Sequence, residues 1–329
     1  MQAHQRLSIV ETSQVGEARR TAQALGRELG FDEVACGRLG LAATELGTNL
    51  VRHARDGSLL LRACAPDAVE LVAWDHGPGM DLARCLRDGY STAGTAGEGL
   101  GAVQRASDRF SAYSLPGRGS VIALRVQRAP TVSPSPFEVG MVGLPAPGEQ
   151  VSGDGWCWHE AGGRVSLLVA DGLGHGPDAA VAAETAVTGL AGLRGDSPAA
   201  TLTTLHDALR PTRGAAAALA SFSATDTGLR YAGAGNICGR LISGVSDRSL
   251  MSQHGTLGVQ IRRLQDMAYD WPAHGILVMH SDGIATRWTL DDAPGLLQCD
   301  PTVIAAWILR EHCRGRDDAT VVVVKRREH

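Results

Sequence analysis

The sequence predicts a mixed α/β protein of two domains, a two-layer α/β sandwich followed by a strand-rich domain with flanking helices. The chain has 329 residues and is 44% hydrophobic, which is enough for two cores of ordinary size. Helical spacing of apolar residues precedes strand patterns in the first part, and strand patterns dominate the second. A stretch rich in Pro and Ser, RAPTVSPSP, lies between them. We therefore expect domains at 1–127 and 137–329, joined by a linker at 128–136.

In the first part, apolar residues recur at helical spacing between Leu39 and Leu50, and Gly30 is placed to end the preceding helix. Apolar runs bounded by turn residues predict the strands. The expected strands lie near 7–10, 58–64, 69–75, 110–115 and 120–126, and the expected helices near 15–29, 32–52 and 100–106. Helices followed by a mostly antiparallel sheet predict a two-layer sandwich.

The second part is richer in strands. Its expected strands lie near 165–170, 217–223, 229–233, 276–280 and 320–325, and its expected helices near 179–193, 198–209 and 302–313. The alanine run at 215–218 is expected inside a buried element rather than in a linker. Two antiparallel sheets with flanking helices fit this order, although the pattern alone does not determine the strand pairing.

Composition argues against several classes of function. The net charge of −4 and the 4% aromatic content give no reason to expect nucleic-acid binding. No stretch has the apolar length of a membrane helix or of a signal peptide. Seven cysteines without CxxC spacing fit reduced thiols, so we expect a cytoplasmic protein. Lys325 is the only lysine, which excludes a P-loop and means that any nucleotide site uses another design.

Three polar residues of the second expected helix point to a nucleotide pocket. Glu45, Asn49 and His53 are spaced at i, i+4 and i+8 and therefore share one face. The side-chain oxygen of Asn49 suits a hydrated Mg²⁺, and Glu45 suits a general base. Taken singly, such polar residues are more often a solvated helix edge.

Two glycine-rich stretches extend this pocket. The run DHGPGM, beginning at Asp75, ends a strand, and an aspartate there can accept a hydrogen bond from the exocyclic amine of adenine. The run GEGLG at 97–101 opens a helix, where backbone N–H groups can hold phosphates without lysine. Each glycine cluster alone is more typical of a turn, and only the ordered set indicates a site. The candidate nucleotide-binding residues are Glu45, Asn49, Asp75, Gly77, Gly79, Gly97, Gly99, Leu100 and Gly101.

Residues 1–127 resemble the Bergerat-type ATP-binding fold of the histidine-kinase, gyrase and MutL superfamily, in its branch of bacterial anti-sigma-factor serine kinases. ELGTNLVRHA is similar to the N-box, DHGPGM to the adenine-binding box and GEGLGAVQR to the phosphate-binding lid segment. The resemblance implies that Asn49 binds the Mg²⁺ of ATP, that Glu45 activates the attacking group and that Asp75 contacts adenine. It also implies phosphorylation of a serine on a small protein partner.

The second part carries acidic residues beside its expected strands. These residues are Asp154, Asp171, Asp282, Asp317 and Asp318. Carboxylates that converge at one end of a sheet repel one another, and divalent cations relieve that repulsion. Oxygen-only ligands favour Mg²⁺ or Mn²⁺, and two such ions can activate a water that attacks a phosphate. Any one Asp-Gly pair is more often only a turn, so the argument depends on the ordered set.

Residues 137–326 resemble the SpoIIE-like group of PPM-type, Mg²⁺- or Mn²⁺-dependent protein phosphatases, through PAPGEQVSGDGW, LLVADGLGHGPDAA, TRGAAAALASF, YAGAGNI, MHSDGI and RDDAT. The resemblance implies a β-sandwich flanked by helices, with Asp171 bridging two metal ions. The implied metal ligands are Asp154, Asp171, the carbonyl of Gly172, Asp282, Asp317 and the adjacent Asp318, and the expected catalytic residues are Asp171 and Asp282. Asn236, in the GAGN turn, is expected to shape the site. His175 is expected to contact substrate or water rather than to bind metal.

The two resemblances together predict a bifunctional regulator in bacterial partner switching. The phosphatase domain would act on a phosphorylated STAS-type anti-sigma-factor antagonist, and the N-terminal domain would bind ATP with Mg²⁺ and phosphorylate a serine. In the alternative, the N-terminal domain is a non-catalytic module that binds ATP or a partner and regulates the phosphatase. A non-catalytic scaffold is a third alternative, against which the retained acidic residues count. No nucleic-acid or membrane partner is expected, and a homodimer is compatible with the sequence.

Overall fold

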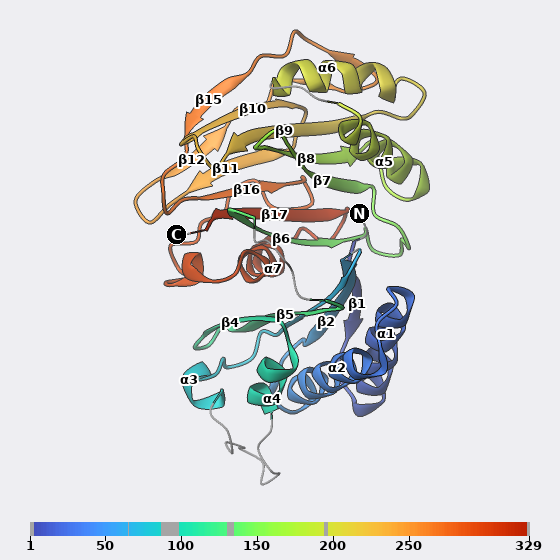
Figure 1. The fold of residues 1–329 in the computed structure, drawn as a ribbon, viewed down its shortest axis with the longest axis vertical. Coiled ribbons are helices and arrows are strands. Elements are labelled where there is room, and N and C mark those ends of the chain that lie inside the picture. The colour runs from blue at the N-terminus through green and yellow to red at the C-terminus, as the bar shows by residue number, and fades with distance from the viewer. Residues whose placement is uncertain (1–2, 65, 87–98, 130–134, 194–196, 328–329) are drawn as a thin grey trace. The chain divides into compact units, whose positions relative to one another are not determined.

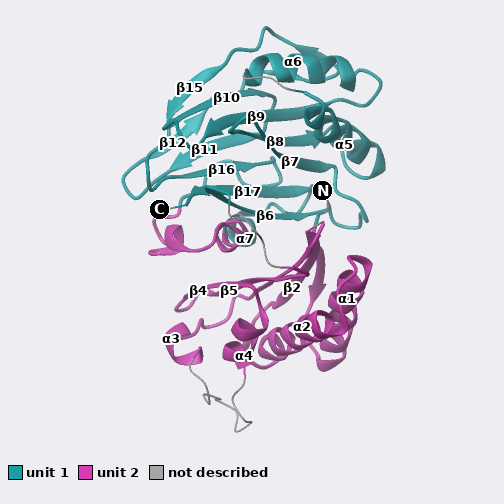
Figure 2. Ribbon diagram, viewed as in Figure 1, with its two compact units in different colours: residues 1–3, 134–289, 308–329 teal, residues 4–133, 290–307 magenta. Residues whose placement is uncertain are grey.

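The computed structural model describes residues 3–64, 66–86, 99–129, 135–193 and 197–327, and the chain forms two compact units (Figures 1 and 2). Unit 1 comprises Met1–Ala3, Pro134–Thr289 and Ile308–His329, and unit 2 comprises His4–Ser133 and Leu290–Trp307. The residues 290–307, which we expected within the second domain, thus group with the first part of the chain. The expected linker at 128–136 lies partly outside the described residues.

Unit 2 contains a five-stranded antiparallel sheet covered on one face by helices (Figure 1). The strand order is β1 (Gln5–Ser8), β2 (Ser58–Cys64), β3 (Ala68–Trp74), β5 (Gly119–Gln127) and β4 (Arg109–Leu115). The helices are α1 (Thr12–Glu28), α2 (Glu33–His53), the short α3 (Leu82–Cys85) and α4 (Gly99–Ala106). Apolar residues of α1, α2 and α4 pack on alternate residues of the strands in one core. The predicted two-layer α/β sandwich is confirmed.

The first strand lies two residues earlier than expected. β1 ends at Ser8, and Val10 is exposed, because the chain turns there into a helix. Glu11 and Gln14 form a capping box at the start of α1, so the residues around Val10 belong to the helix cap rather than to the sheet.

Glu70, on β3, is the centre of a buried ionic cluster on the sheet face opposite α1 and α2. Val69 and Leu71 point into the helical core, so the period-two alternation of a strand places Glu70 on the other face. Its carboxylate accepts hydrogen bonds from Arg62 at 2.7 Å and from Arg125 at 2.6 Å. Although burial alone raises the pKa of Glu70, these two guanidinium groups hold it well below its ordinary range.

The residues Leu290–Trp307 pack on this same face of the unit 2 sheet. They include the 3₁₀ turn η1 (Leu296–Gln298) and the first part of α7 (Pro301–His312), a helix that ends in unit 1. The hydroxyl of Thr302 donates a hydrogen bond to Glu70 Oε2 at 3.2 Å. The ring of Trp307 packs edge-on against that of Tyr113, with the two ring centroids 4.8 Å apart. This burial is the physical reason that the segment groups with unit 2.

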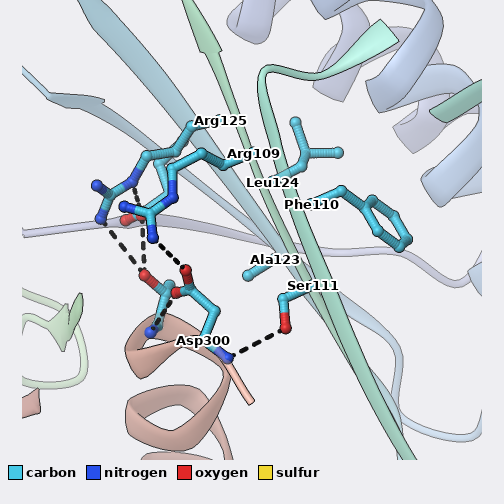
Figure 3. Close-up of a pocket in the computed structure, with 9 residues that line it drawn as sticks. Arg109, Phe110, Ser111, Ala123, Leu124, Arg125 and Asp300 are labelled. Carbon is cyan, nitrogen blue, oxygen red and sulfur yellow. Dashed lines mark hydrogen bonds and ion pairs between the residues drawn. The ribbon is translucent and has the colours of Figure 1, made fainter. Parts of the chain in front are cut away.

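A small hollow lies where this segment meets the sheet (Figure 3). Asp300 is turned toward Arg109, which it meets at 3.1 Å, and its backbone nitrogen donates to the hydroxyl of Ser111 at 3.2 Å. Because the charged groups lining the hollow pair with one another, we assign it a structural role.

Acid should destabilise unit 2 through Glu70, and Glu70→Gln should reduce that dependence. A carboxyl whose folded pKa lies below its unfolded value of about 4.5 contributes stability above pH 4.5 and loses it as the pH falls further. At pH 7, the variant leaves the buried guanidinium group of Arg62 and the partly buried one of Arg125 without their anion, which should cost about 3 kcal/mol. Urea unfolding followed by circular dichroism at pH 7 and pH 3.5 checks both expectations. The exposed Glu17→Gln is the control, and equal pH dependence in wild type and Glu70→Gln would contradict the assignment.

Unit 1 contains two five-stranded antiparallel sheets and a short hairpin (Figure 1). The first sheet has the order β15 (Met267–Asp270), β10 (Gly228–Ala234), β9 (Ala215–Ser223), β8 (Arg164–Gly172) and β7 (Asp154–Ala161). The second has the order β12 (Asp247–Leu250), β11 (Cys238–Ile242), β16 (Ile276–His280), β17 (Ala319–Arg326) and β6 (Phe137–Leu144). β13 (Gly255–Thr256) and β14 (Gln260–Ile261) form the hairpin, and the helices are α5 (Pro177–Ala191) and α6 (Pro198–Leu209).

Unit 1 is a β-sandwich flanked by helices, as predicted. One core contains side chains from both sheets, including Val169, Phe222 and Met279. A second core lies between α5, α6 and the other face of the first sheet. The expected alanine run at the start of β9 is buried, with Ala215 and Ala217 in this second core and Ala216 and Ala218 in the first. Several strands, among them β6, β7 and β11, were not expected, because glycines and polar residues interrupt their apolar pattern. No helix in the described part of the chain is long and apolar enough to cross a membrane.

Candidate functional site

The acidic residues of unit 1 lie at strand ends that the sandwich brings together. Asp154 begins β7 and is paired directly with Asp171 of β8, so their side chains are on one face. Asp282 follows the end of β16, and Asp318 directly precedes β17, which is the antiparallel neighbour of β16. The hydroxyl of Ser281 donates to Asp154 Oδ2 at 2.6 Å and so connects the two sheets at this point.

Burial and like charge act together on these carboxyl groups. Burial raises the pKa of Asp171, and the nearby charges of Asp154 and Asp282 raise it further. The pKa of Asp154 is also raised, first by burial and then by the charges of Asp318 and Asp282, against the hydrogen bond from Ser281. Such a cluster is costly to ionise in the absence of cations, and divalent cations remove that cost.

Four of the carboxylates have one oxygen held by a donor of the protein. Asp318 Oδ1 accepts from the backbone N–H of Ala146 at 2.8 Å, and Asp282 Oδ2 accepts from the Asn236 amide at 2.6 Å. Asp317 Oδ1 accepts from the Asp318 backbone at 2.9 Å, and Ser281 holds Asp154. These donors restrict the orientation of each carboxylate.

Two of the remaining oxygens fit a cation. Asp154 Oδ1 and Asp318 Oδ2 are buried and make no hydrogen bond of ordinary geometry with any residue that the structure describes. Buried anionic oxygens without a donor are rare unless a cation satisfies them. Within the described ranges no three acidic, His or Cys side chains already enclose a common point. The case for Mn²⁺ or Mg²⁺ therefore rests on these two oxygens and on the all-oxygen donor set.

The glycines after Asp171 and Asp282 are required by close backbone approach rather than by a turn. A Cβ on Gly172 would lie 2.1 Å from the carbonyl oxygen of Ala179, and one on Gly283 would lie 2.0 Å from that of Asp318. Neither glycine has a positive φ. The Asp-Gly pairs of this chain therefore allow α5 and the loop of Asp318 to pack against the acidic residues.

His175 is paired with Glu149 instead of joining the acidic cluster. Its Nδ1 lies 2.7 Å from Glu149 Oε1, and 60% of the His175 side chain is exposed. The imidazole is thus oriented by a carboxylate that stands before Asp154 in the chain. The pattern of the sequence did not indicate Glu149, because its partner is 26 residues away.

The expected nucleotide site of unit 2 is partly assembled by α2. Glu45 and Asn49 are half-buried on this helix, and His53 is its exposed last residue. Asp75 follows β3 and is buried. Its carboxylate accepts hydrogen bonds from the backbone N–H groups of Gly77 at 2.6 Å and Ser120 at 3.2 Å.

The loop after Asp75 is tied to the turn between β4 and β5. Gly79 has φ 78°, and a Cβ there would lie 2.6 Å from the carbonyl oxygen of Leu115. Gly119 lies so close to Asp75 that a Cβ on Gly119 would be 2.0 Å from the backbone carbonyl oxygen of Asp75. Met80 N–H donates to Ser114 Oγ at 2.7 Å. Ser114, Gly119 and Ser120 were not predicted, although the GRGS turn after β4 was visible in the sequence.

The expected phosphate-binding run is described only in part. Gly97 lies outside the described residues, whereas Gly99, Leu100 and Gly101 begin α4. The side chain of Leu100 packs into the core of unit 2, so only its backbone is available to a phosphate. Among the described residues, none lies within 4 Å of a Cβ placed on Gly99.

Two protein-family models match this chain, one over each part. Residues 161–327 match the family Stage II sporulation protein E (SpoIIE), and residues 10–126 match the histidine kinase-like ATPase domain. The chain belongs to the SpoIIE family. It therefore contains a PPM-type serine/threonine protein phosphatase domain, fused to a kinase-like ATPase domain.

Individual proteins and solved structures are similar to parts of this chain. The serine/threonine-protein kinase RsbT of Bacillus subtilis (strain 168) is 35% identical over 109 residues, which are 32% of this chain and 82% of RsbT. A structure of the bacterial stressosome, described as a modular system adapted to control secondary messenger signaling, is 27% identical with a TM-score of 0.54. That match covers 57% of this chain and 99% of the other. The PP2C phosphatase domain of SpoIIE from Bacillus subtilis, with a fragment of its regulatory domain, is 17% identical with a TM-score of 0.49, over 95% and 92% of the two chains. A SpoIIE-type phosphatase with an RsbT-like domain is a protein of partner-switching regulation.

Proposed function

We propose that the chain removes phosphate from a serine of a STAS-type anti-sigma-factor antagonist, using two Mn²⁺ or Mg²⁺ ions held by the acidic cluster of unit 1. The observation that carries this proposal is the pair of buried, unsatisfied oxygens on Asp154 and Asp318 within a set of acidic residues. The SpoIIE family match supports the reaction, and the likeness to RsbT and to a stressosome structure supports a substrate from partner switching.

Some residues of unit 1 would bind the metal ions, and others orient the side chains that do so. Asp154, Asp171, Asp282, Asp317, Asp318 and the Gly172 carbonyl would hold the ions. When bound, the ions neutralise the phosphate charge and lower the pKa of water. Asn236 keeps one oxygen of Asp282 in place, and the other stays available to an ion. His175, oriented by Glu149, is exposed to a substrate that enters beside Asp171.

For unit 2 we propose ATP binding with Mg²⁺ at Asn49, adenine recognition by Asp75 and phosphate transfer to a serine assisted by Glu45. The half-buried position of Glu45 beside Asn49 favours a kinase over a module that only binds ATP. The name of RsbT, a serine/threonine-protein kinase, supports the same proposal. The regulatory module remains the competing hypothesis.

A substrate panel tests the proposed phosphatase function. The full chain with Mn²⁺ is incubated with a phosphorylated STAS-type protein, with the same protein after denaturation, and with a small aryl phosphate. Release of phosphate should be fastest from the folded phosphoprotein, because a regulator recognises the surface around the phosphoserine. Equal rates on the folded protein and on the small ester would contradict the proposed substrate class.

A further inference from the structure

Ser281 lies between the last residue of β16 and the loop of Asp282, and its side chain is completely buried. Its hydroxyl oxygen accepts a hydrogen bond from the backbone N–H of Thr320 at 2.9 Å. The same hydroxyl lies 2.6 Å from Asp154 Oδ2. The Ser281 backbone N–H also donates to the carbonyl oxygen of Thr320 at 3.1 Å. Both the backbone and the side chain of Ser281 are therefore hydrogen-bonded to β17.

These contacts determine where the single hydroxyl proton points. A backbone N–H only donates, so the Thr320 contact uses a lone pair of Ser281 Oγ. The proton is therefore available to Asp154 Oδ2, as a short charge-assisted hydrogen bond to a carboxylate. The carboxylate of Asp154 is thus held at Oδ2, while the buried Oδ1 has no hydrogen bond of ordinary geometry from a described residue. The Thr320 side chain also lowers the pKa of Asp154, by a weaker contact than that of Ser281.

We propose that Ser281 is a positioning residue for the metal centre, which turns Asp154 so that Oδ1 faces the cation. This inference rests on the proposed metal site. It assigns Ser281 a role across the sandwich, since Asp154 belongs to the first sheet and Ser281 follows a strand of the second. A residue with this role changes metal affinity when its donor is removed, whereas a buried serine that only fills space does not.

Direct Mn²⁺ binding to the full chain, measured by isothermal titration calorimetry, tests the proposal with Ser281→Ala. Loss of a hydrogen-bonded partner of a metal ligand typically weakens affinity by about 10- to 100-fold, and we expect a loss in this range. Phosphate release should recover at high Mn²⁺, with kcat close to wild type and a raised Mn²⁺ requirement. Ser221→Ala is the matched control, because Ser221 is 2% exposed and its buried hydroxyl has no hydrogen-bond partner within the described residues.

Ser281→Thr keeps the hydroxyl and should retain Mn²⁺ affinity within a few-fold of wild type, even where the added methyl group lowers the melting temperature. Wild-type affinity in Ser281→Ala, or an equal loss of affinity in Ser221→Ala or Ser281→Thr, overturns the proposal. If Ser281→Ala does not fold, Ser281→Thr still tests the proposal, because loss of Mn²⁺ affinity in a folded variant that keeps the hydroxyl overturns it. Absence of Mn²⁺ binding by the wild-type chain would instead overturn the metal site itself, so the two failures are distinguishable.

Discussion

Asp171→Asn should reduce Mn²⁺-dependent release of phosphate from a phosphoserine protein by about 10³-fold or more. Asp171 is paired with Asp154 across β7 and β8, and its pKa is raised by burial and then by the charges of Asp154 and Asp282. Its replacement by a neutral amide removes a ligand expected to contact both ions. Metal ions contribute several kcal/mol to such reactions, and each 1.4 kcal/mol is a factor of ten in rate. Phosphate release over a Mn²⁺ titration measures the effect.

The same variant should leave the fold intact without metal. Because burial and the neighbouring carboxylates already disfavour the ionised form of Asp171 without metal, a neutral amide should leave the melting temperature in EDTA equal to that of the wild type or higher. Added Mn²⁺ should raise the melting temperature of the wild type and raise that of the variant much less. Asp207→Asn, an exposed change on α6, is the control for both assays. Full activity in Asp171→Asn would show that Asp171 is not a metal ligand.

Glu45→Ala should abolish transfer of labelled phosphate from ATP to a STAS-type partner, a loss of about 10²-fold or more for a general base. Glu45 lies one turn from Asn49 on α2 and is half-buried at the edge of the core. It does not have to contact ATP itself, so nucleotide affinity, measured with a fluorescent ATP analogue, should stay close to wild type. Asn49→Ala, in contrast, should weaken Mg²⁺-dependent binding of that analogue.

Glu33→Ala is the matched control for Glu45, because Glu33 is an exposed acidic residue of the same helix. It should transfer phosphate at the wild-type rate. If the wild-type chain binds ATP but transfers phosphate to no partner, unit 2 is a regulatory module and the kinase proposal fails. Transfer that persists in Glu45→Ala would leave the kinase in place and remove Glu45 from its mechanism.

Much of the architecture followed from local patterns. The helix α6 and the strands β2 and β16 lie at the residues expected from their apolar spacing, because burial of one face imposes a period on the sequence. The glycines beside Asp171 and Asp282 could also be read from the sequence, but the structural requirement for glycine at these positions could not. As turn residues they would need no close neighbour, whereas the structure shows backbone atoms about where their side chains would be.

The division of the chain into compact units did not follow from local patterns. The boundary expected from RAPTVSPSP assigned 290–307 to the second domain, and the SpoIIE match over 161–327 includes them. In the structure, Thr302 and Trp307 of this segment are buried on the sheet of unit 2. Nothing in the spacing of those residues specifies which sheet they cover, since an apolar helix face can pack on any apolar partner. Glu70 was likewise hidden within an apolar strand, because its compensating charges come from Arg62 and Arg125 on the two neighbouring strands.

The sequence by itself determined the fold class, the family and the set of acidic residues, because these depend on residue types and spacings along the chain. Only the tertiary structure showed that Ser281 holds Asp154 and that Asn236 holds Asp282, which are contacts over 127 and 46 residues. It also left Asp154 Oδ1 and Asp318 Oδ2 without a hydrogen bond of ordinary geometry from any described residue. Whether a buried carboxylate is satisfied depends on atoms from several strands meeting at one point, and a linear pattern carries no information about that meeting.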